Sequence, residues 1–236
     1  MKNEIKKLLI LVRHGERIDR VGATPKCGMS NPELTEKGKV QSFDTSKTII
    51  DKFAKFGINQ ISPNLIQIRS SPYLRTIQTS VYLSIGLNTK LFEDKNITKK
   101  IEAIYIDNGL RKRIKSDKKY NNEDIKYISV NAYSKFDEEI KKFEFLEGGG
   151  FDYTPETKEQ CEKRSFDYVN NILSKEIENH YNNKVFIIIS HRGPLKFIVK
   201  KLGIVLKDKK DLDYCSQFYF DVSNGIENSK FLEFSK

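Results

Sequence analysis

The pattern of apolar and polar positions predicts short buried strands that alternate with longer helices. Runs that are apolar on both faces are typical of interior strands of a parallel sheet, and each run here stops at a glycine, proline or polar turn signal. We expect these strands at residues 8–12, 64–69, 101–106 and 184–190. Apolar residues recur at helical spacing between them, and we expect helices at about 35–56, from 72 onward, at about 155–181 and at 194–203.

Local signals define the first of these helices. Thr35 can cap its amino end, Glu36 in the first turn favours the helix dipole, and Gly57 ends it. We expect its buried face to consist of Val40, Phe43, Ile49, Ile50 and Phe53.

The rest of the chain completes one domain. Residues 215–222 and 230–234 alternate well enough to form two strands joined by a turn at Asn224-Gly225. Residues 111–150 are charged and less regular, and we expect an insertion over the sheet edge with a helix at about 130–143. No repeat or linker divides the sequence. We therefore predict a single α/β domain over residues 1–236, a three-layer sandwich whose mostly parallel central sheet has helices on both faces.

Two histidines mark the carboxyl ends of predicted strands. His14 comes directly after the first run with Arg13 beside it, and His191 comes directly after the run at 184–190. If these strands are neighbours, both imidazoles lie at the edge where open α/β sheets bind ligands. Arg75 lies near the start of the helix after the second strand, where free amides also favour an anion. Two histidines and two arginines predict a pocket for a dianion such as a phosphoryl group, because arginine binds two oxygens at once and keeps its charge.

Composition narrows the class of protein. The 236 residues are 38% hydrophobic and 31% charged, which is typical of a globular protein, and no apolar run approaches the roughly 18 residues of a membrane helix. Three widely spaced cysteines argue against a disulfide framework and favour a cytoplasmic location. The net charge of +10 invites a nucleic-acid function, but only nine of the 42 basic residues are arginines and the lysines are scattered. We therefore disfavour nucleic acid and a membrane as partners and expect an anionic substrate.

Other chemistries fit the residues less well. A metal site would need carboxylate or cysteine ligands beside the histidines, and the flanking arginines would repel the cation. The sequence lacks both the glycine-flanked serine of a nucleophile elbow and a Walker phosphate loop.

Four motifs occur in the order found in branch 1 of the histidine phosphatase superfamily, the phosphoglycerate-mutase-like branch. They are Arg13-His14-Gly15-Glu16, Leu34-Thr35-x-x-Gly38-x-x-Gln41, Ser71-x-x-x-Arg75-x-x-Gln78-Thr79 and Ser190-His191-x-Gly193-Pro194. The resemblance covers the chain from about Lys7 to Val222. The form of residues 13–19 is most similar to the phosphatase domains of the T-cell-receptor-signalling suppressors and to the ecdysteroid-phosphate phosphatases. The mutases proper usually carry a serine and a Trp-Asn pair after the first motif, which this chain lacks.

The resemblance implies a phosphoric monoester hydrolase of the histidine acid phosphatase type, without a metal or an organic cofactor. His14 would attack phosphorus and become a phosphohistidine, which water then hydrolyses. Arg13, Arg75 and His191 would hold the phosphoryl oxygens, and Arg17 would add a phosphate or substrate contact.

The general acid of the relatives is a glutamate shortly after the third strand. The matching stretch here begins Ile106-Asp107-Asn108, so Asp107 is the candidate and Glu102 the alternative. The alternative for Asp107, which we favour less, is a turn residue that bonds its own backbone.

Two alternatives to a phosphatase remain at this point. One is a phosphoglycerate-type mutase with the same chemistry, and the other is a phospho-ligand-binding module that lacks an effective acid. We expect the substrate to be a phosphorylated small molecule or a phosphoprotein, and the relatives suggest a homodimer. The basic segment that begins at Arg111 and Arg113 suggests the hypothesis that the substrate carries extra negative charge.

Overall fold

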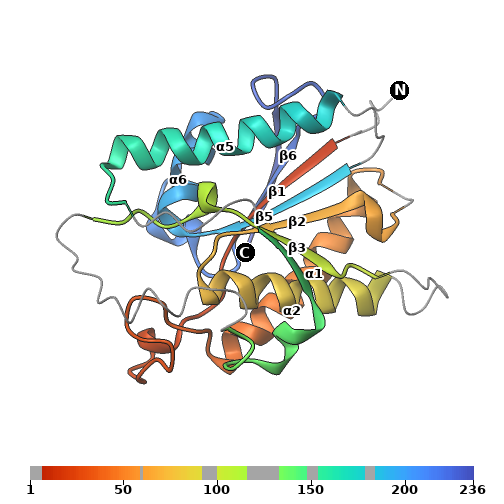
Figure 1. Ribbon diagram of the computed structural model, residues 1–236. Helices are drawn as coiled ribbons and strands as arrows, with labels where there is room; N and C mark the ends of the chain where they lie inside the picture. Colours follow the sequence, from red (N-terminus) through yellow and green to blue (C-terminus); the bar gives the residue numbers. More distant parts are fainter. Residues whose placement is uncertain (1–6, 59–60, 92–99, 116–132, 148–153, 179–183) are drawn as a thin grey trace.

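A seven-stranded sheet forms the centre of the part of the chain that the computed structural model describes, residues 7–58, 61–91, 100–115, 133–147, 154–178 and 184–236 (Figure 1). Its strands are β1 (Lys7–Arg13), β2 (Ile66–Ser70), β3 (Ala103–Ile106), β4 (Glu144–Glu147), β5 (Lys184–Ser190), β6 (Gln217–Asp221) and β7 (Lys230–Ser235). They lie in the order β4-β3-β2-β5-β1-β6-β7. The strands from β4 to β1 are parallel, whereas β6 is antiparallel to β1 and β7 is antiparallel to β6.

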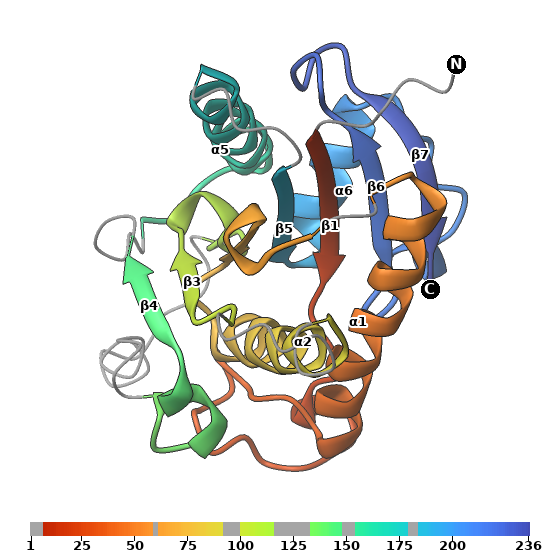
Figure 2. The same ribbon diagram turned by 90° about the vertical axis from the view of Figure 1, so that its right-hand side faces the viewer.

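Helices cover both faces of this sheet, as Figures 1 and 2 show. Among the described helices, α1 (Glu36–Lys55) and α2 (Leu74–Leu91) lie on one face, and α5 (Lys158–Glu178) and α6 (Arg192–Lys201) lie on the other. Alternate side chains of β1 pack into the cores on opposite faces of the sheet. Leu8 and Ile10 pack into the core under α1 and α2, and Leu9 and Leu11 pack into the core under α5 and α6. The predicted three-layer α/β sandwich is confirmed.

The strands that carry the two histidines are neighbours at the centre of the sheet. β1 pairs with β5 in parallel so that Arg13 lies opposite Ser190, and β2 pairs with the other side of β5. The backbone continues these pairings past the strand ends, because His14 N donates to Ser190 O at 3.2 Å and Ser71 N donates to Ile189 O at 3.0 Å. The residues that directly follow β1, β2 and β5 therefore lie close together at the carboxyl edge of the sheet.

The structure corrects several predicted boundaries. Thr35 caps α1 as expected, its Oγ1 accepting from Gly38 N at 2.9 Å. Val40, expected on the buried face, is 59% exposed. Ile49 and Phe53 are buried as expected, and small residues occupy the rest of the buried face because α1 crosses α2 closely: a Cβ on Gly86 would collide with the side chain of Ser46. Helices α2, α5 and α6 begin at Leu74, Lys158 and Arg192, shifted by two or three residues from the predicted starts.

The segment 111–150 contains an edge strand that the sequence pattern did not predict. β4 pairs in parallel with β3, with Glu144 opposite Ala103. Where a helix was expected at 130–143, Tyr133 is helical, residues 134–136 form a turn, and Glu138–Lys142 form a short 3-10 helix; residues 130–132 lie outside the described part. A four-residue strand of mixed polarity owes its conformation to pairing with a distant strand, and such pairing has no local signal.

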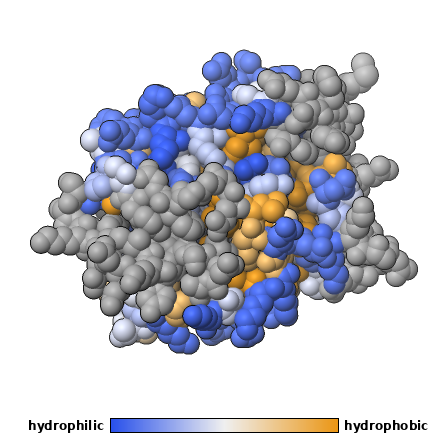
Figure 3. Space-filling view, in the orientation of Figure 1, coloured by the Kyte–Doolittle hydropathy of each residue, from blue (hydrophilic) through white to orange (hydrophobic). Residues whose placement is uncertain are grey.

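The surface agrees with this layered arrangement. On the face in Figure 3, hydrophilic residues prevail above and below, and apolar residues gather between them where the sheet lies. Among the helices of the described part, none has the length and apolar character needed to cross a membrane.

Candidate active site

The four residues expected at the strand ends line a single cavity of about 440 Å³. Arg13 and His14 come from the end of β1, His191 comes from the end of β5, and Arg75 lies in the first turn of α2. The rings of His14 and His191 are 5.4 Å apart between centroids, and all four side chains belong to buried residues. The structure thus brings together the set that the sequence predicted.

His14 is held in one orientation and one tautomer. Its Nδ1 lies 2.9 Å from the carbonyl oxygen of Gly15, which can only accept, so Nδ1 carries the proton and Nε2 keeps a free lone pair. Burial lowers the pKa of His14 well below its usual value, and the nearby Arg75 and Arg13 charges lower it further. The imidazole is therefore neutral at pH 7.

Arg75 and His191 form a second fixed pair. The guanidinium can only donate, so its Nη2, 3.2 Å away, donates to His191 Nδ1, and His191 Nε2 donates to Ser71 Oγ at 2.7 Å. Nε and Nη1 of Arg75 are buried and have no hydrogen-bond partner among the described residues. Burial, then the charge of Arg17, lowers the pKa of Arg75 to about 9, so it stays charged at neutral pH. A buried cation with two uncommitted donor atoms is what an oxyanion would satisfy.

Arg13 is held by a segment that sequence reasoning did not connect with the site. Its Nη1 donates to Leu212 O at 2.6 Å, and its guanidinium lies 4.2 Å from the centre of the Tyr214 ring, which itself is 5.9 Å from the His14 ring. Burial and the charge of Arg192 lower the pKa of Arg13 to about 10. Tyr214 was missed because it precedes a strand rather than coming after one, and no motif marks it.

The remaining motif residues support the turn that carries His14. Gly15 N donates to Thr79 Oγ1 at 3.0 Å, and Glu16 N donates to Gln41 Oε1 at 3.0 Å. Gly15 also faces the backbone of Gly38, where an added Cβ would lie 2.5 Å from the carbonyl oxygen. These residues therefore fix the backbone of the turn, and the glycines allow α1 to approach it closely.

Arg17 lines the cavity and is paired within the protein. Its Nε and Nη2 donate to the two carboxylate oxygens of Asp19 at 2.9 and 2.6 Å. This bidentate pair orients the guanidinium at the cavity wall. A role in contacting substrate stays a prediction.

The structure does not bring Asp107 to the other four residues. Asp107 is buried, its Oδ2 accepts from Arg69 Nη1 at 3.1 Å, and it is not among the described residues that line the cavity. Glu102 precedes β3 and lines a separate hollow at the other end of that strand. The geometry therefore supports neither carboxylate as the acid, and the role predicted for Asp107 stays a prediction.

The wall of the cavity is strongly basic. Its described lining contains nine arginines and lysines beside the two histidines, and no aspartate or glutamate. Within the described ranges, no three histidine, cysteine, aspartate or glutamate side chains lie together in a way that could hold a metal ion. The site can bind and polarise an anion, and it offers His14 Nε2 as a nucleophile.

Comparisons with known proteins agree with this arrangement. The family model described as histidine phosphatase superfamily (branch 1) matches residues 9–98. No curated protein matches the chain.

Solved structures match over nearly the whole chain. The ecdysone phosphate phosphatase of Bombix mori has a TM-score of 0.60 at 15% identity, covering 97% of this chain and 92% of that one. The phosphoserine phosphatase of Entamoeba histolytica has a TM-score of 0.53 at 16% identity and covers 98% and 97%. YhfR of Bacillus stearothermophilus has a TM-score of 0.53 at 19% identity and covers 96% and 94%. At such identities the likeness establishes a shared fold.

The fold is therefore that of the phosphoglycerate-mutase-like α/β proteins. The family model over residues 9–98 and the shared fold over nearly the whole chain both agree with the resemblance to branch 1 of the histidine phosphatase superfamily that the four motifs indicated. This likeness supports phosphatase activity at the level of the class.

Proposed function

We propose that this protein is a metal-independent phosphomonoesterase that acts through a phosphohistidine at His14. The observation that carries the proposal is the fixed tautomer of His14, whose Nδ1 is committed to Gly15 O while Nε2 is free at a cavity lined by cations. A neutral imidazole with a lowered pKa is competent as a nucleophile without a separate base.

The reaction proceeds in two displacements at phosphorus. In the first, the lone pair of His14 Nε2 forms a bond to phosphorus, the bond from phosphorus to the ester oxygen breaks with its electron pair going to that oxygen, and the oxygen takes a proton from solvent so that the alcohol leaves. In the second, a water oxygen attacks phosphorus, the P–N bond breaks, and inorganic phosphate departs while the water proton is released. Both steps build negative charge on the equatorial oxygens, which the cations of the cavity stabilise.

Each of the neighbouring residues has a role in this scheme. Arg13 and the uncommitted Nε and Nη1 of Arg75 bind phosphoryl oxygens. His191 orients Arg75 by accepting from its Nη2, so that the other two nitrogen atoms face the substrate. Arg17, held by Asp19, contributes positive charge at the wall. The superfamily match and the phosphate-ester phosphatases among the solved structures support this function.

The decisive test combines turnover with trapping of the intermediate. Wild-type protein should release phosphate from p-nitrophenyl phosphate, and alkaline quenching of a reaction with radiolabelled substrate should leave label on His14. His14→Ala should lose both signals, with turnover falling at least about 10⁴-fold, whereas His180→Ala, the matched change at the remaining histidine, should keep them. Interconversion of phosphoglycerates without net phosphate release would instead identify a mutase. Absence of turnover on a broad phosphate panel, with phosphate binding retained, would identify a binding module.

A further inference from the structure

A second group of cations extends from the phosphate-binding residues along the same cavity. Lys112, Arg113 and Lys115 come shortly after the 3-10 helix that succeeds β3, and Lys158 begins α5; all four line the cavity with His14 and Arg75. The two segments that carry them lie more than 40 residues apart in the sequence. Their side chains therefore meet here only because of the fold.

Arginine usage argues that this group is more than part of a lysine-rich surface. Only nine of the 42 basic residues are arginines. Six of these nine line the cavity: Arg13, Arg17, Arg20, Arg75, Arg113 and Arg192. The other three, Arg69, Arg111 and Arg164, pair with carboxylates away from the cavity lining. Arg13, Arg17 and Arg20 line the cavity although Asp213 or Asp19 also lies within ion-pair distance. Lysines thus account for the scattered surface charge, and the arginines concentrate where an anion would bind.

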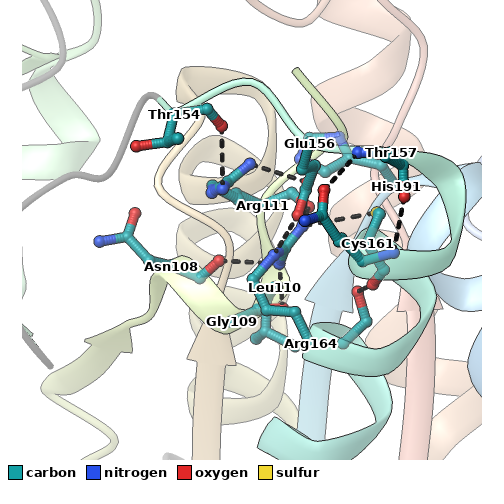
Figure 4. Close-up of polar contacts among 12 residues, drawn as sticks. Asn108, Gly109, Leu110, Arg111, Thr154, Glu156, Thr157, Cys161, Arg164 and His191 are labelled. Carbon is teal, nitrogen blue, oxygen red and sulfur yellow. Dashed lines mark hydrogen bonds and ion pairs between the residues drawn. The ribbon is translucent and has the colours of Figure 1, made fainter. Parts of the chain in front are cut away.

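A network of ion pairs and hydrogen bonds around Glu156, shown in Figure 4, anchors the segment 111–115 to α5. The carboxylate of Glu156 accepts from Arg111 Nη1 at 2.8 Å and from Arg164 Nη2 at 2.7 Å and Nε at 2.9 Å. Arg164 also donates to the carbonyl oxygens of Asn108, Gly109 and Arg111. The loop from 108 to 111 is thereby tied to α5 by side chains on both segments.

Backbone pairing extends this anchor to the cations themselves. Glu156 N donates to Ile114 O at 2.9 Å, and Ile114 is buried. Lys112, Arg113 and Lys115 flank Ile114, so the anchor sets their positions at the cavity wall. Arg111 is buried in the network and does not line the cavity, whereas Arg113 does.

We propose that Lys112, Arg113, Lys115 and Lys158 form a second anion subsite, and that the substrate is a small phosphomonoester with a second phosphate group. This proposal rests on the phosphatase function proposed above and names the substrate class of that same site. The cavity volume of about 440 Å³ suits a small molecule that spans both subsites. Binding energy from the remote phosphate positions the scissile one at His14.

The test uses two substrates that differ only in the second anion, 1,6-hexanediol monophosphate and 1,6-hexanediol bisphosphate. Wild-type protein should hydrolyse the bisphosphate with the higher kcat/KM. The triple variant Lys112→Gln/Arg113→Gln/Lys115→Gln should lower kcat/KM for the bisphosphate about tenfold more than for the monophosphate. Its control is Lys175→Gln/Lys200→Gln/Lys201→Gln, which removes the same charge from exposed positions outside the cavity lining and should leave both rates unchanged. Added salt should reduce the preference for bisphosphate in wild-type protein.

Each outcome bears on one proposal or the other. Equal losses for both substrates, or the same loss in the control, would overturn the second subsite and leave the phosphatase standing. If wild-type protein hydrolyses neither substrate, calorimetry on His14→Ala tests the subsite alone, and the phosphatase proposal fails only if the broad phosphate panel also shows no turnover. Tighter binding of the bisphosphate than of the monophosphate, weakened by the triple variant, would support the subsite, and equal affinities would refute it.

Discussion

The floor and the rim of the cavity bind the same kind of charge but are built in different ways. The floor, here Arg13, His14, Arg75 and His191, lies at the ends of two central strands and the start of a helix, and backbone pairing of β1, β5 and β2 sets its geometry. The rim, here residues 111–115 with 154–158, consists of two loops that side-chain ion pairs hold together around Glu156.

Because of this difference, we expect substitutions in the two regions to have different effects on stability and on catalysis. The floor buries Arg75 with two uncommitted donor atoms, which costs folding free energy and is useful only when an anion binds. In the rim, the buried charge of Arg111 and the part-buried charge of Arg164 both meet the carboxylate of Glu156. Changes in the floor should therefore affect catalysis first, and changes in the rim network should affect stability first.

The largest expected effect comes from Arg75→Met. Removing a cation that faces the transition state should lower kcat/KM about 10³-fold, while the midpoint of thermal unfolding in phosphate-free buffer should stay the same or rise, because an apolar side chain replaces an under-paired buried charge. Arg69→Met is the matched control: it breaks the ion pair with Asp107 outside the cavity and should lower stability more than activity. A large loss of stability in Arg75→Met would contradict the contrast between floor and rim.

Glu156→Gln should produce the opposite result. Without the carboxylate, the buried Arg111 and the part-buried Arg164 charges lose their counterion, and we expect a loss of about 3 kcal/mol of unfolding free energy, measured by urea denaturation. Glu159→Gln, an exposed change one turn further along the chain, should cost less than about 0.5 kcal/mol. If both variants unfold alike, the Arg111–Glu156–Arg164 network does not hold the rim.

The two histidines of the floor should make stability depend on pH. Burial lowers the pKa of both His14 and His191 well below 6.5, so in mildly acidic solution the unfolded chain binds protons that the folded chain does not. Stability should therefore be complete above pH 6.5 and fall below it, by up to about 1.4 kcal/mol per pH unit for each histidine. The double variant His14→Asn/His191→Asn should flatten this slope between pH 6.5 and 5.

The smallest effect is expected from Asp107→Asn. Because Asp107 is paired with Arg69 and does not line the cavity, kcat on an alkyl phosphate should fall less than about fivefold. A general acid would contribute roughly 10² to 10⁴ and would remove the alkaline limb of the pH–rate profile when lost. A loss of that size, confined to substrates with poor leaving groups, would restore Asp107 to the role that the sequence predicted for it.

The sequence by itself was sufficient to predict which residues form the floor of the site. An apolar run that ends in Arg13-His14 and another that ends in His191 specify buried strands and the residues directly after them, since both signals are local. Parallel pairing of such strands then brings their ends to one edge, which is a property of the fold class rather than of individual contacts. The four motifs and the cap at Thr35 were readable for the same reason.

Only the tertiary structure decided which residues surround that floor. In the fold, Asp107 pairs with Arg69, and Glu156 pairs with both Arg111 and Arg164. Tyr214 packs against Arg13. Each of these contacts joins residues that are not neighbours in the sequence. The scarcity of arginines was visible in the sequence, but no local signal shows which arginines line the cavity and which carboxylates they pair with. The packing of the elements determines the ion-pair partners, because an arginine pairs with the carboxylate that the fold places beside it.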